Sequence, residues 1–348
     1  MRKRVDLGDV AERVGVSKST VHYALYQPDR LGAETLDKVL TVVRELGYRP
    51  NLLARSLRTR RTFTIGVITP FLGNYTEKVF AGLEMAAEDN RYTVFLGYTR
   101  GQADREREVV ESFMERAMEG LIILPAEGDE NAGFFRSLQQ EEFPFAFAEH
   151  SFPGVNVDSV GTDDLLGGKL ATRHLIRQGC SKIAFVPPPA PTCRHNWVLR
   201  RLEGCNLALG EAGLPPAGEI VLGTVGETTH HRYAHAAVAD SLRQGEEFDG
   251  VFAANDELAW GAMEALAEAG RQPGQEVAVI GFDDLDPSAY LSVPLTSLRH
   301  PFAAIGNEAF RLLLRRIEKS GDLAVQHILL EPMLVVRQSC GESMVPGQ

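Results

Sequence analysis

The sequence predicts an N-terminal all-α domain followed by an α/β body of two doubly wound parallel-sheet lobes. Three observations support this fold class. Residues 6–48 carry apolar side chains at helical spacing, residues 64–148 alternate short apolar strands with amphipathic helices, and residues 182–282 repeat that alternation. Because parallel strands joined by helices form open sheets covered on both faces, each α/β stretch predicts one lobe.

The first two predicted helices are short and joined by a tight turn. The first has one apolar face, made of Leu7, Val10, Ala11 and Val14. Gly15 ends it, and the hydroxyl of Ser17 can cap the next helix. The second helix also has an apolar face, made of Val21, Ala24 and Leu25. Together they predict a helix-turn-helix.

A third helix completes this headpiece and ends at Gly47. Its apolar stripe consists of Leu36, Val39, Leu40, Val43 and Leu46. In a helix-turn-helix, the start of the second helix meets base edges in the major groove. The residues predicted to contact DNA there are Ser17, Lys18, Ser19, Thr20, His22 and Tyr23. The pattern alone also fits three amphipathic helices that merely pack together.

The charge is divided unevenly between the two parts of the chain. The 348 residues have a net charge of -11, which by itself argues against a nucleic-acid partner. Residues 1–61, however, hold 13 Lys+Arg against 7 Asp+Glu, and the remainder holds 23 against 40. The basic N-terminal part is therefore suited to DNA phosphates, and the acidic body is not.

Several classes of function lack sequence support. The four cysteines are widely spaced without a C-x-x-C pair, which is typical of reduced cytoplasmic thiols. The N-terminus has no apolar signal segment, and no run of about 18 apolar residues could span a bilayer, so we expect a cytoplasmic protein. Without a nucleophile elbow, phosphate-binding loop or zinc-protease motif, we expect neither an enzyme nor a cofactor.

The body is predicted from two successions of strands and helices. The first has strands at 64–69, 92–98, 120–124 and 143–148, with helices at 75–90, 103–118 and 130–140. The second has strands at 182–187, 219–223, 250–254 and 277–282, with helices at 195–210, 229–243 and 255–269. Open parallel sheets bind ligands beyond the carboxyl ends of their strands, so two facing lobes predict a cleft.

The strand ends supply the candidate ligand contacts. Glu149, Asn255, Asp256 and Asp283 directly follow strands, and Arg201 lies in the helix after 182–187. Carboxylates with an arginine and an amide suit a polyhydroxylated ligand, so a sugar or sugar acid is the first expectation. Aromatic side chains near the same ends can stack on a sugar ring, and these are Phe71, Tyr75, Trp197 and Phe282.

Other roles remain open for several of these residues. Asp256 is better explained as the N-cap of the helix at 255–269, and Asp284 as a cap or a bridge between loops. Phe71 and Phe282 could be core, and Arg201 a structural ion pair. His231 and His235 have zinc-compatible i, i+4 spacing but no evident third ligand, so surface positions fit them better. The Pro-rich stretch 187–191 fits a rigid connector better than a lid over the cleft.

Five segments in order resemble the lac-repressor family of transcriptional regulators. They are DVAERVGVSKSTVHYAL (9–25), VRELGYRPNLLARSLRTRRTFTIGVITP (43–70), VFAANDELAWGAMEAL (251–266), VAVIGFDD (277–284) and PLTSLRHP (294–301). In the effector site, Arg201, Asn255 and Asp283 match the usual residue types of the family, whereas Glu149 replaces a commoner aspartate. His22-Tyr23 stands where the family usually has Ser-Arg, so a relative's operator sequence does not transfer.

The resemblance also assigns a role to the segment after the headpiece. Residues 51–58 are too short for a stable isolated helix and, from composition alone, fit an Arg-rich linker. The family implies a hinge helix that forms against its counterpart in the minor groove, with Leu57 as an apolar wedge. The other DNA contacts expected from it are Asn51, Arg55 and Arg58.

The predicted organisation is a headpiece at 1–49, a hinge at 50–61, a body at 62–340 and a tail at 341–348. We expect lobe 1 to span about 62–161 and 292–323, and lobe 2 about 162–291 and 324–340. This organisation predicts a repressor that binds pseudo-palindromic operator DNA and is controlled allosterically by a small metabolite. The tail lacks a leucine heptad, so we expect a homodimer. The alternative is a stand-alone sugar-binding protein of periplasmic type without a DNA role.

Overall fold

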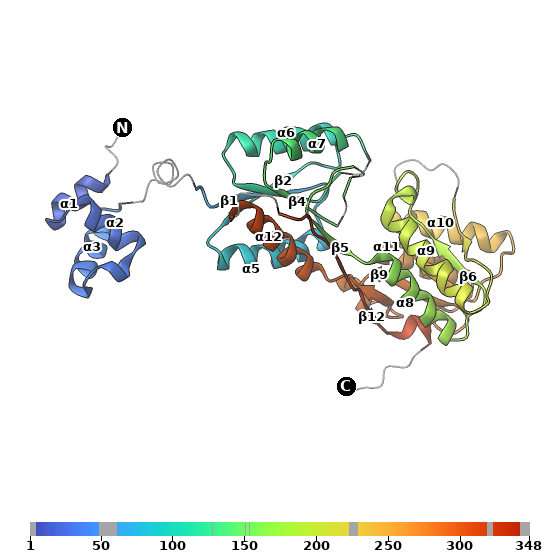
Figure 1. Cartoon of the computed structure of the whole chain (residues 1–348). Coiled ribbons are helices and arrows are strands. Elements are labelled where there is room, and N and C mark those ends of the chain that lie inside the picture. The colour runs from blue at the N-terminus through green and yellow to red at the C-terminus, as the bar shows by residue number, and fades with distance from the viewer. Residues whose placement is uncertain are drawn as a thin grey trace. The chain divides into compact units, whose positions relative to one another are not determined.

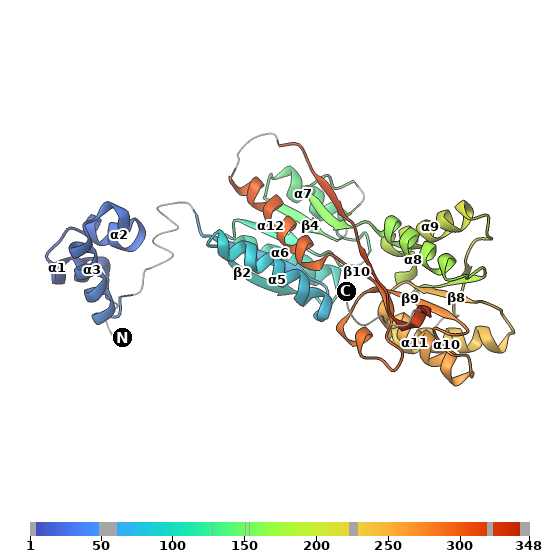
Figure 2. The same ribbon diagram turned by 90° about the horizontal axis from the view of Figure 1, so that it is seen from below.

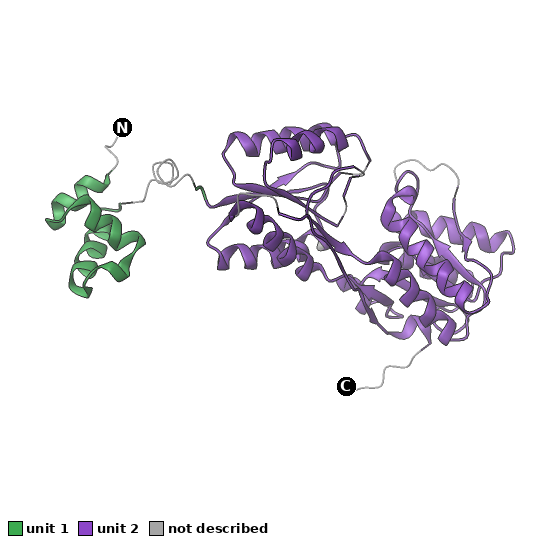
Figure 3. Ribbon diagram, in the orientation of Figure 1, with its two compact units in different colours: residues 1–62 green, residues 63–348 purple. Residues whose placement is uncertain are grey.

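The computed structural model describes residues 5–48, 61–126, 128–149, 151–152, 154–222, 229–318 and 323–341. It contains two compact units, residues 1–62 and 63–348 (Figure 3). The predicted hinge contacts lie outside the described residues, and so does almost all of the predicted tail. Those contacts are Asn51, Arg55, Leu57 and Arg58.

The first unit is a three-helix domain made of α1 (Leu7–Val14), α2 (Lys18–Tyr26) and α3 (Ala33–Glu45), with a short 3-10 helix at Pro28–Arg30. Gly15 adopts φ +78° where α1 ends, and the Ser17 hydroxyl accepts a hydrogen bond from the Thr20 backbone N–H at 3.0 Å, which confirms the predicted cap. One residue from each helix is fully buried in the core: Val10, Val21 and Val39.

The predicted stripe of α3 is wrong at one position. Val42 packs against the core, whereas Leu40 is half-buried outside the core cluster. One face of α3 is formed by residues at i, i+3, i+4 and i+7, namely Val39, Val42, Val43 and Leu46. Leu40 follows Val39 directly and so lies about 100° around the helix axis from it.

Lobe 1 contains a six-stranded parallel sheet in the order β11-β5-β4-β3-β1-β2. Its strands are β1 (Thr64–Thr69), β2 (Thr93–Tyr98), β3 (Gly120–Ile123), β4 (Phe145–Ala148), β5 (Ser159–Thr162) and β11 (His327–Leu330). Helices α5 (Asn74–Asp89) and α12 (Phe302–Glu318) cover one face, and α6 (Ala103–Glu115) and α7 (Ala132–Gln140) cover the other (Figure 1). Separate apolar clusters lie on the two faces.

Lobe 2 repeats this architecture with the strand order β12-β10-β9-β8-β6-β7. Its strands are β6 (Ile183–Val186), β7 (Gly218–Glu219), β8 (Gly250–Ala253), β9 (Ala278–Asp283), β10 (Thr296–Arg299) and β12 (Met333–Val335), of which only β12 runs antiparallel to its neighbour. Helices α8 (Asp164–Arg177) and α9 (Asn196–Glu211) pack together, and so do α10 (His230–Arg243) and α11 (Asp256–Glu268). The described part of the lobe also has 3-10 turns at Thr192–Arg194, Asp286–Ala289 and Gln338–Cys340.

The chain passes between the lobes three times, which corrects the predicted lobe boundaries (Figure 2). It crosses after β5, again between β10 and α12, and finally between β11 and β12. The predicted assignment of 292–323 to lobe 1 is therefore wrong at β10, and that of 324–340 to lobe 2 is wrong at β11. Both strands have only four residues, so their local sequence pattern does not show to which sheet they belong. That is determined by long-range pairing, of β10 with β9 and of β11 with β5.

None of the described helices is long and apolar enough to cross a lipid bilayer.

Glycines allow paired helices to approach at backbone distance. A Cβ on Gly82 of α5 would lie 2.0 Å from the carbonyl oxygen of Ala303, and one on Gly306 of α12 would lie 2.0 Å from the carbonyl oxygen of Val79. Since neither carbonyl belongs to a movable side chain, any larger residue must push the two helices apart.

The substitution Gly82→Ala is expected to lower the unfolding free energy of the body by about 1–3 kcal/mol, the usual cost of overpacking. Gly210→Ala is the matched control, because a Cβ at that helical position meets nothing within 4 Å. Its better helix propensity should leave stability unchanged or raised by up to about 1 kcal/mol. Urea unfolding measures both; equal midpoints for the two variants would show that the α5–α12 contact tolerates a methyl group.

Candidate DNA-binding surface and ligand cleft

The outer face of α2 carries the predicted DNA contacts. Lys18 and Ser19 are exposed, and His22 and Tyr23 are half-buried. The Ser17 and Thr20 hydroxyls lie 2.9 Å apart in the helix cap, which fixes the start of α2. The predicted set thus divides into capping residues and residues whose side chains face outward.

His22 and Tyr23 belong to a small aromatic cluster on this face. The His22 ring lies 4.9 Å from the ring of Tyr26 and 6.1 Å from that of Tyr23. The guanidinium carbon of Arg30 lies 5.4 Å above the Tyr23 ring, a cation–π distance. Tyr26 and Arg30, which sequence reasoning missed, therefore limit how the two unusual side chains can be oriented.

A cavity of about 590 Å³ lies between the two lobes of the second unit. Seven of the eight predicted effector contacts line it: Phe71, Tyr75, Glu149, Trp197, Arg201, Asn255 and Asp283. The polar and aromatic residues that the prediction missed are Asp164, Thr192, His230, Glu257, Trp260 and His300. The fold therefore brings together strand ends that are more than 200 residues apart in the chain.

Phe282 is the predicted contact that does not line this cavity. Its side chain is fully buried, and the guanidinium carbon of Arg201 lies 3.5 Å from the centre of its ring. Side chains alternate along a strand, so Phe282 points into lobe 2 while the next residue, Asp283, reaches the cleft. Phe282 therefore packs against the guanidinium of Arg201 from inside lobe 2. This agrees with the alternative interpretation of Phe282 as a core residue.

Arg201 is the central polar residue of the cleft. Its Nε donates to Asp164 Oδ1 at 2.8 Å, its Nη1 donates to the Ala254 carbonyl oxygen at 2.5 Å, and its Nη2 lies 2.9 Å from His300 Nε2. The Asp283 carboxylate is 3.9 Å from Nη1. The guanidinium also lies over Trp197, with 4.7 Å from its carbon to the ring centre. Three of its five N–H groups are thus already engaged within the protein.

His300 joins the cleft to two of the passages between the lobes. Because a guanidinium only donates, His300 Nε2 is the acceptor, and the proton is assigned to Nδ1, which donates to the Thr162 hydroxyl at 2.5 Å. Burial, with Arg201 beside it, lowers the pKa of His300 to about 3, so the ring is neutral. Thr162 ends β5 and His300 follows β10, so this contact links the first two crossings.

The two strand-end carboxylates have unusual backbones and raised pKa values. Glu149 adopts φ +70° and Asp283 φ +110°, conformations that persist only where the surrounding structure holds them and that gather at functional sites. Burial, reinforced by the charge of Asp164, raises the pKa of Glu149 to about 8. Burial also raises the pKa of Asp283 to about 7, with Arg201 opposing the rise. Both groups titrate near neutral pH.

The substitution Glu149→Gln is expected to flatten the pH dependence of stability. The pKa of Glu149 rises from its ordinary 4.5 to about 8 on folding, so between these values the folded state holds a proton that the unfolded state has lost. Stability must then fall as pH rises. Gln keeps the shape without the titration and should remove a slope of up to about 1.4 kcal/mol per pH unit.

Urea unfolding between about pH 5 and pH 8 measures this slope, with the exposed Glu108→Gln as control. Parallel pH profiles for the wild type and Glu149→Gln would mean that Glu149 is charged in the folded protein.

The residues beside the cleft at α11 have structural roles. Asn255, and not Asp256, is the N-cap of α11, since its Oδ1 accepts from the Leu258 backbone N–H at 2.9 Å. Asp256 is buried one residue later and accepts hydrogen bonds from three donors: Leu285 N at 2.8 Å, Ser288 Oγ at 2.6 Å and Ser297 Oγ at 2.5 Å. The capping interpretation of Asp256 is therefore wrong, because α11 begins one residue earlier than a cap at 256 requires.

Asp284 connects loops, as one of its two predicted roles stated. Its carboxylate accepts from Arg299 Nε and from Arg337 Nη2, each at 2.6 Å.

The two histidines with i, i+4 spacing on α10 each contact a different glutamate of α11. His231 lies 3.1 Å from Glu264, and His235 lies 2.9 Å from Glu268. Within the described ranges, no three His, Cys, Asp or Glu side chains gather as metal ligands would.

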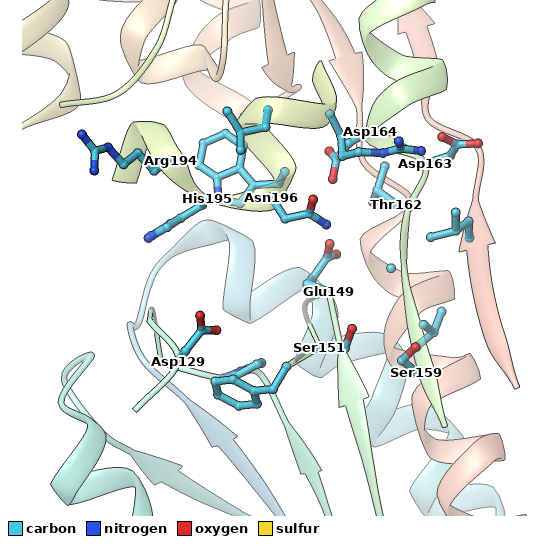
Figure 4. A pocket seen from close by; sticks show the side chains of 18 of the residues that line it. Asp129, Glu149, Ser151, Ser159, Thr162, Asp163, Asp164, Arg194, His195 and Asn196 are labelled. Atoms are coloured by element: carbon cyan, nitrogen blue, oxygen red, sulfur yellow. The ribbon is translucent and has the colours of Figure 1, made fainter. Parts of the chain in front are cut away.

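A second cavity of about 650 Å³ adjoins the first and shares four lining residues with it: Pro125, Glu149, Asp164 and Trp197. In Figure 4 the Glu149 carboxylate points from lobe 1 into this space, toward Asn196 at the start of α9, and Asp129 and Ser151 lie on the lobe 1 side. The cleft thus has two chambers that meet at Glu149.

Comparison with known proteins agrees with both units. Residues 6–51 match the model for bacterial regulatory proteins of the lacI family, and residues 172–340 match the periplasmic binding protein-like domain. The chain is 32% identical to the ribose operon repressor of Escherichia coli (strain K12) over 95% of its own length and 98% of that protein. It is 28% identical to the ribose operon repressor of Haemophilus influenzae over 95% and 97% of the two chains.

Among solved structures, the lac repressor dimer bound to operator and an anti-inducer is similar with a TM-score of 0.83 and 26% identity, covering 97% of this chain and 99% of that one. A helix-turn-helix unit joined to a two-lobed body with a polar interlobe cleft defines a DNA-binding regulator that responds to a ligand. This chain belongs to the lacI family of bacterial regulatory proteins.

Proposed function

We propose that this protein is a cytoplasmic transcriptional repressor whose operator affinity is set by a sugar bound between the lobes. The observation that carries the proposal is the convergence of carboxylates, an arginine, an amide and aromatic rings on one interlobe cavity, in a chain that also carries a helix-turn-helix. Curated relatives named ribose operon repressors support the sugar class. The headpiece argues against a stand-alone periplasmic sugar receptor.

Control of DNA binding follows from the arrangement of the crossings. A ligand that contacts both lobes favours one lobe arrangement, and the chain start of the body at Phe63 leads directly into β1 of lobe 1. If operator and ligand prefer different arrangements, each changes the affinity of the other by the same factor. His300 lines the cleft and contacts Thr162, so a ligand that displaces His300 would act on the first two chain crossings between the lobes together.

The proposed functional form is a homodimer, since one headpiece covers only half of a pseudo-palindromic operator. β2 is the edge strand of its sheet and exposes large apolar side chains, among them Phe95 and Leu96, each 45% exposed. Leu96 also borders a groove lined by Leu72 and Phe80. Exposed apolar patches of this kind mark association surfaces, and the lac repressor structure above is itself a dimer.

Thermal unfolding of the full-length protein against ribose, other sugars, polyols, sugar acids and nucleobases tests the ligand half of the proposal. A ligand at 100 times its dissociation constant should add about 2.7 kcal/mol of stability. The shift should be lost in Asp283→Asn and kept in the exposed control Asp104→Asn. A shift that survives Asp283→Asn would place the ligand outside this cleft.

Selection of duplexes from a random pool by the full-length protein tests the DNA half of the proposal. The expected product is a pseudo-palindrome, and failure to enrich any sequence would contradict operator binding.

A further inference from the structure

The first chamber of the cleft holds an excess of acidic side chains. Glu149, Asp164, Glu257 and Asp283 all line it, and Arg201 supplies the one guanidinium among its described lining residues. Two imidazoles also line the chamber, of which His300 is neutral and His230 lies 4.0 Å from Glu257. A ligand that enters this chamber therefore meets up to four carboxyl groups and one fixed cation.

Arg201 is already committed to other carboxylates. It pairs with Asp164 at 2.8 Å and lies 3.9 Å from Asp283, and its side chain is only 4% exposed. The guanidinium is fixed between Trp197 and Phe282 and cannot turn toward the opposite lobe without breaking these contacts. Among the described residues, Glu149 on that opposite lobe therefore has no ion-pair partner closer than the neutral His300, at 3.9 Å.

One buried oxygen of Glu149 has no hydrogen-bond partner in the part of the chain that the structure describes. The Glu149 side chain is 5% exposed, and its Oε1 receives no hydrogen bond. In Figure 4 this carboxylate points toward Asn196, at the place where the two chambers meet. A buried carboxyl oxygen left without a donor is costly, so a ligand that supplies a donor here gains more than it would at an exposed position.

Aromatic side chains form part of the remaining wall of the chamber, beside aliphatic and proline residues. Phe71, Tyr75, Trp197 and Trp260 line it, and Phe71 is 46% exposed. The faces of aromatic rings attract cations, and Arg201 already occupies this kind of position above Trp197. Carboxylates combined with aromatic faces are the surroundings in which proteins hold an ammonium group, and they repel a carboxylate or phosphate ligand.

We propose that the effector carries a protonated amine, as an amino sugar does, and that Glu149 and Asp283 hold the ammonium group from opposite lobes. The proposal rests on the proposed function, because it names the charge of the ligand that the cleft takes. It replaces the sugar acid, which was one of the two expectations from sequence, and it ranks an amino sugar above the corresponding neutral sugar. An ammonium between the lobes would also bind them together.

Binding of such a ligand should expel protons from the site. Around Glu149 lie Tyr75 of α5, Asp164 of α8, Arg201 of α9, Asp283 at the end of β9 and His300 after β10. Glu257 and His230 also act on Asp283. Burial and the mutual repulsion of the acids keep the pKa values of Glu149 and Asp283 near neutral, and an ammonium placed between them lowers both. The amine should therefore bind more tightly as pH rises from about 6 to 7, below the range in which an amine with electron-withdrawing neighbours loses its proton.

Matched triads of ligands test the proposal on the full-length protein. Glucose, glucosamine and glucuronate, with the same three forms of galactose and mannose, are compared by thermal shift and by calorimetry in buffers of different ionisation enthalpy. We expect the amine of at least one series to bind about tenfold or more tightly than its neutral form, the scale of one charge-assisted hydrogen bond, with release of protons. Glu149→Gln should remove this preference, and the exposed Glu108→Gln should keep it.

The remaining outcomes overturn the proposal, and they separate it from the proposed function. If a neutral sugar binds and changes operator affinity while no amine binds more tightly, the repressor function stands and the ammonium site does not. Tighter binding of an acid form has the same meaning. If no member of any series binds, the ammonium site is wrong, and the thermal-shift panel that includes ribose decides separately whether the effector is a sugar.

Discussion

Arg201→Ala is expected to lower the unfolding free energy of the body by about 3–5 kcal/mol and to abolish ligand binding, because the change leaves buried charge without its partner. Asp164, with a side chain 15% exposed, loses its 2.8 Å ion pair, and the carbonyl oxygen of Ala254 and the Nε2 of His300 lose their donors. The Trp197 and Phe282 rings also lose the group packed between them.

The neighbouring Arg200→Ala is the matched control for stability. Arg200 pairs with Glu203 on the same helix, with both side chains about half exposed, and pairs of this kind contribute about 0.5 kcal/mol or less. Urea unfolding of both variants gives the comparison. Similar losses for the two arginines would mean that the cleft relaxes around a missing Arg201 and that its buried contacts contribute little.

His22→Ala is expected to weaken binding to the selected operator by about 1–3 kcal/mol, the worth of one good base contact, while binding to unrelated duplexes changes little. The His22 ring lies beside Tyr26 in the middle of α2, the helix that we expect to enter the major groove. His235→Ala on α10 of the body is the control of the same residue type.

Titration of fluorescent operator and random duplexes at one fixed salt concentration measures this effect, since salt alone changes such affinities by orders of magnitude. Equal loss on both duplexes would assign His22 to the phosphate backbone, and no loss on either would remove it from the DNA surface.

Much of the headpiece could be predicted because its pattern is local. The caps at Ser17 and Gly15 and the apolar faces of α1 and α2 depend only on residues within four positions, where helical spacing is decisive. The error at Leu40 arose because Val39 and Leu40 are adjacent and both apolar, so the spacing of apolar residues did not show which of the two helix faces is buried.

Most of the ligand cleft could also be predicted, because parallel strands place their carboxyl ends at one edge of a sheet. Asp164 was missed because β5 is a four-residue strand, Ser-Val-Gly-Thr, without a continuous apolar run. His300 was missed because its place in the cleft depends on the crossing between β10 and α12, which no local pattern indicates. Phe282 was wrongly predicted to line the cleft, because successive side chains point to opposite faces of a strand and it is the next residue, Asp283, that reaches the cleft.

The central claim is that the cleft and the headpiece are thermodynamically coupled, and reciprocity tests it most directly. With the effector found by thermal shift, operator affinity is measured with and without saturating ligand, and ligand affinity with and without saturating operator. Both ratios are expected to differ from one and to be equal, because linkage requires the same factor in both directions. A ligand that binds the cleft with identical affinity in the presence and absence of operator would contradict it.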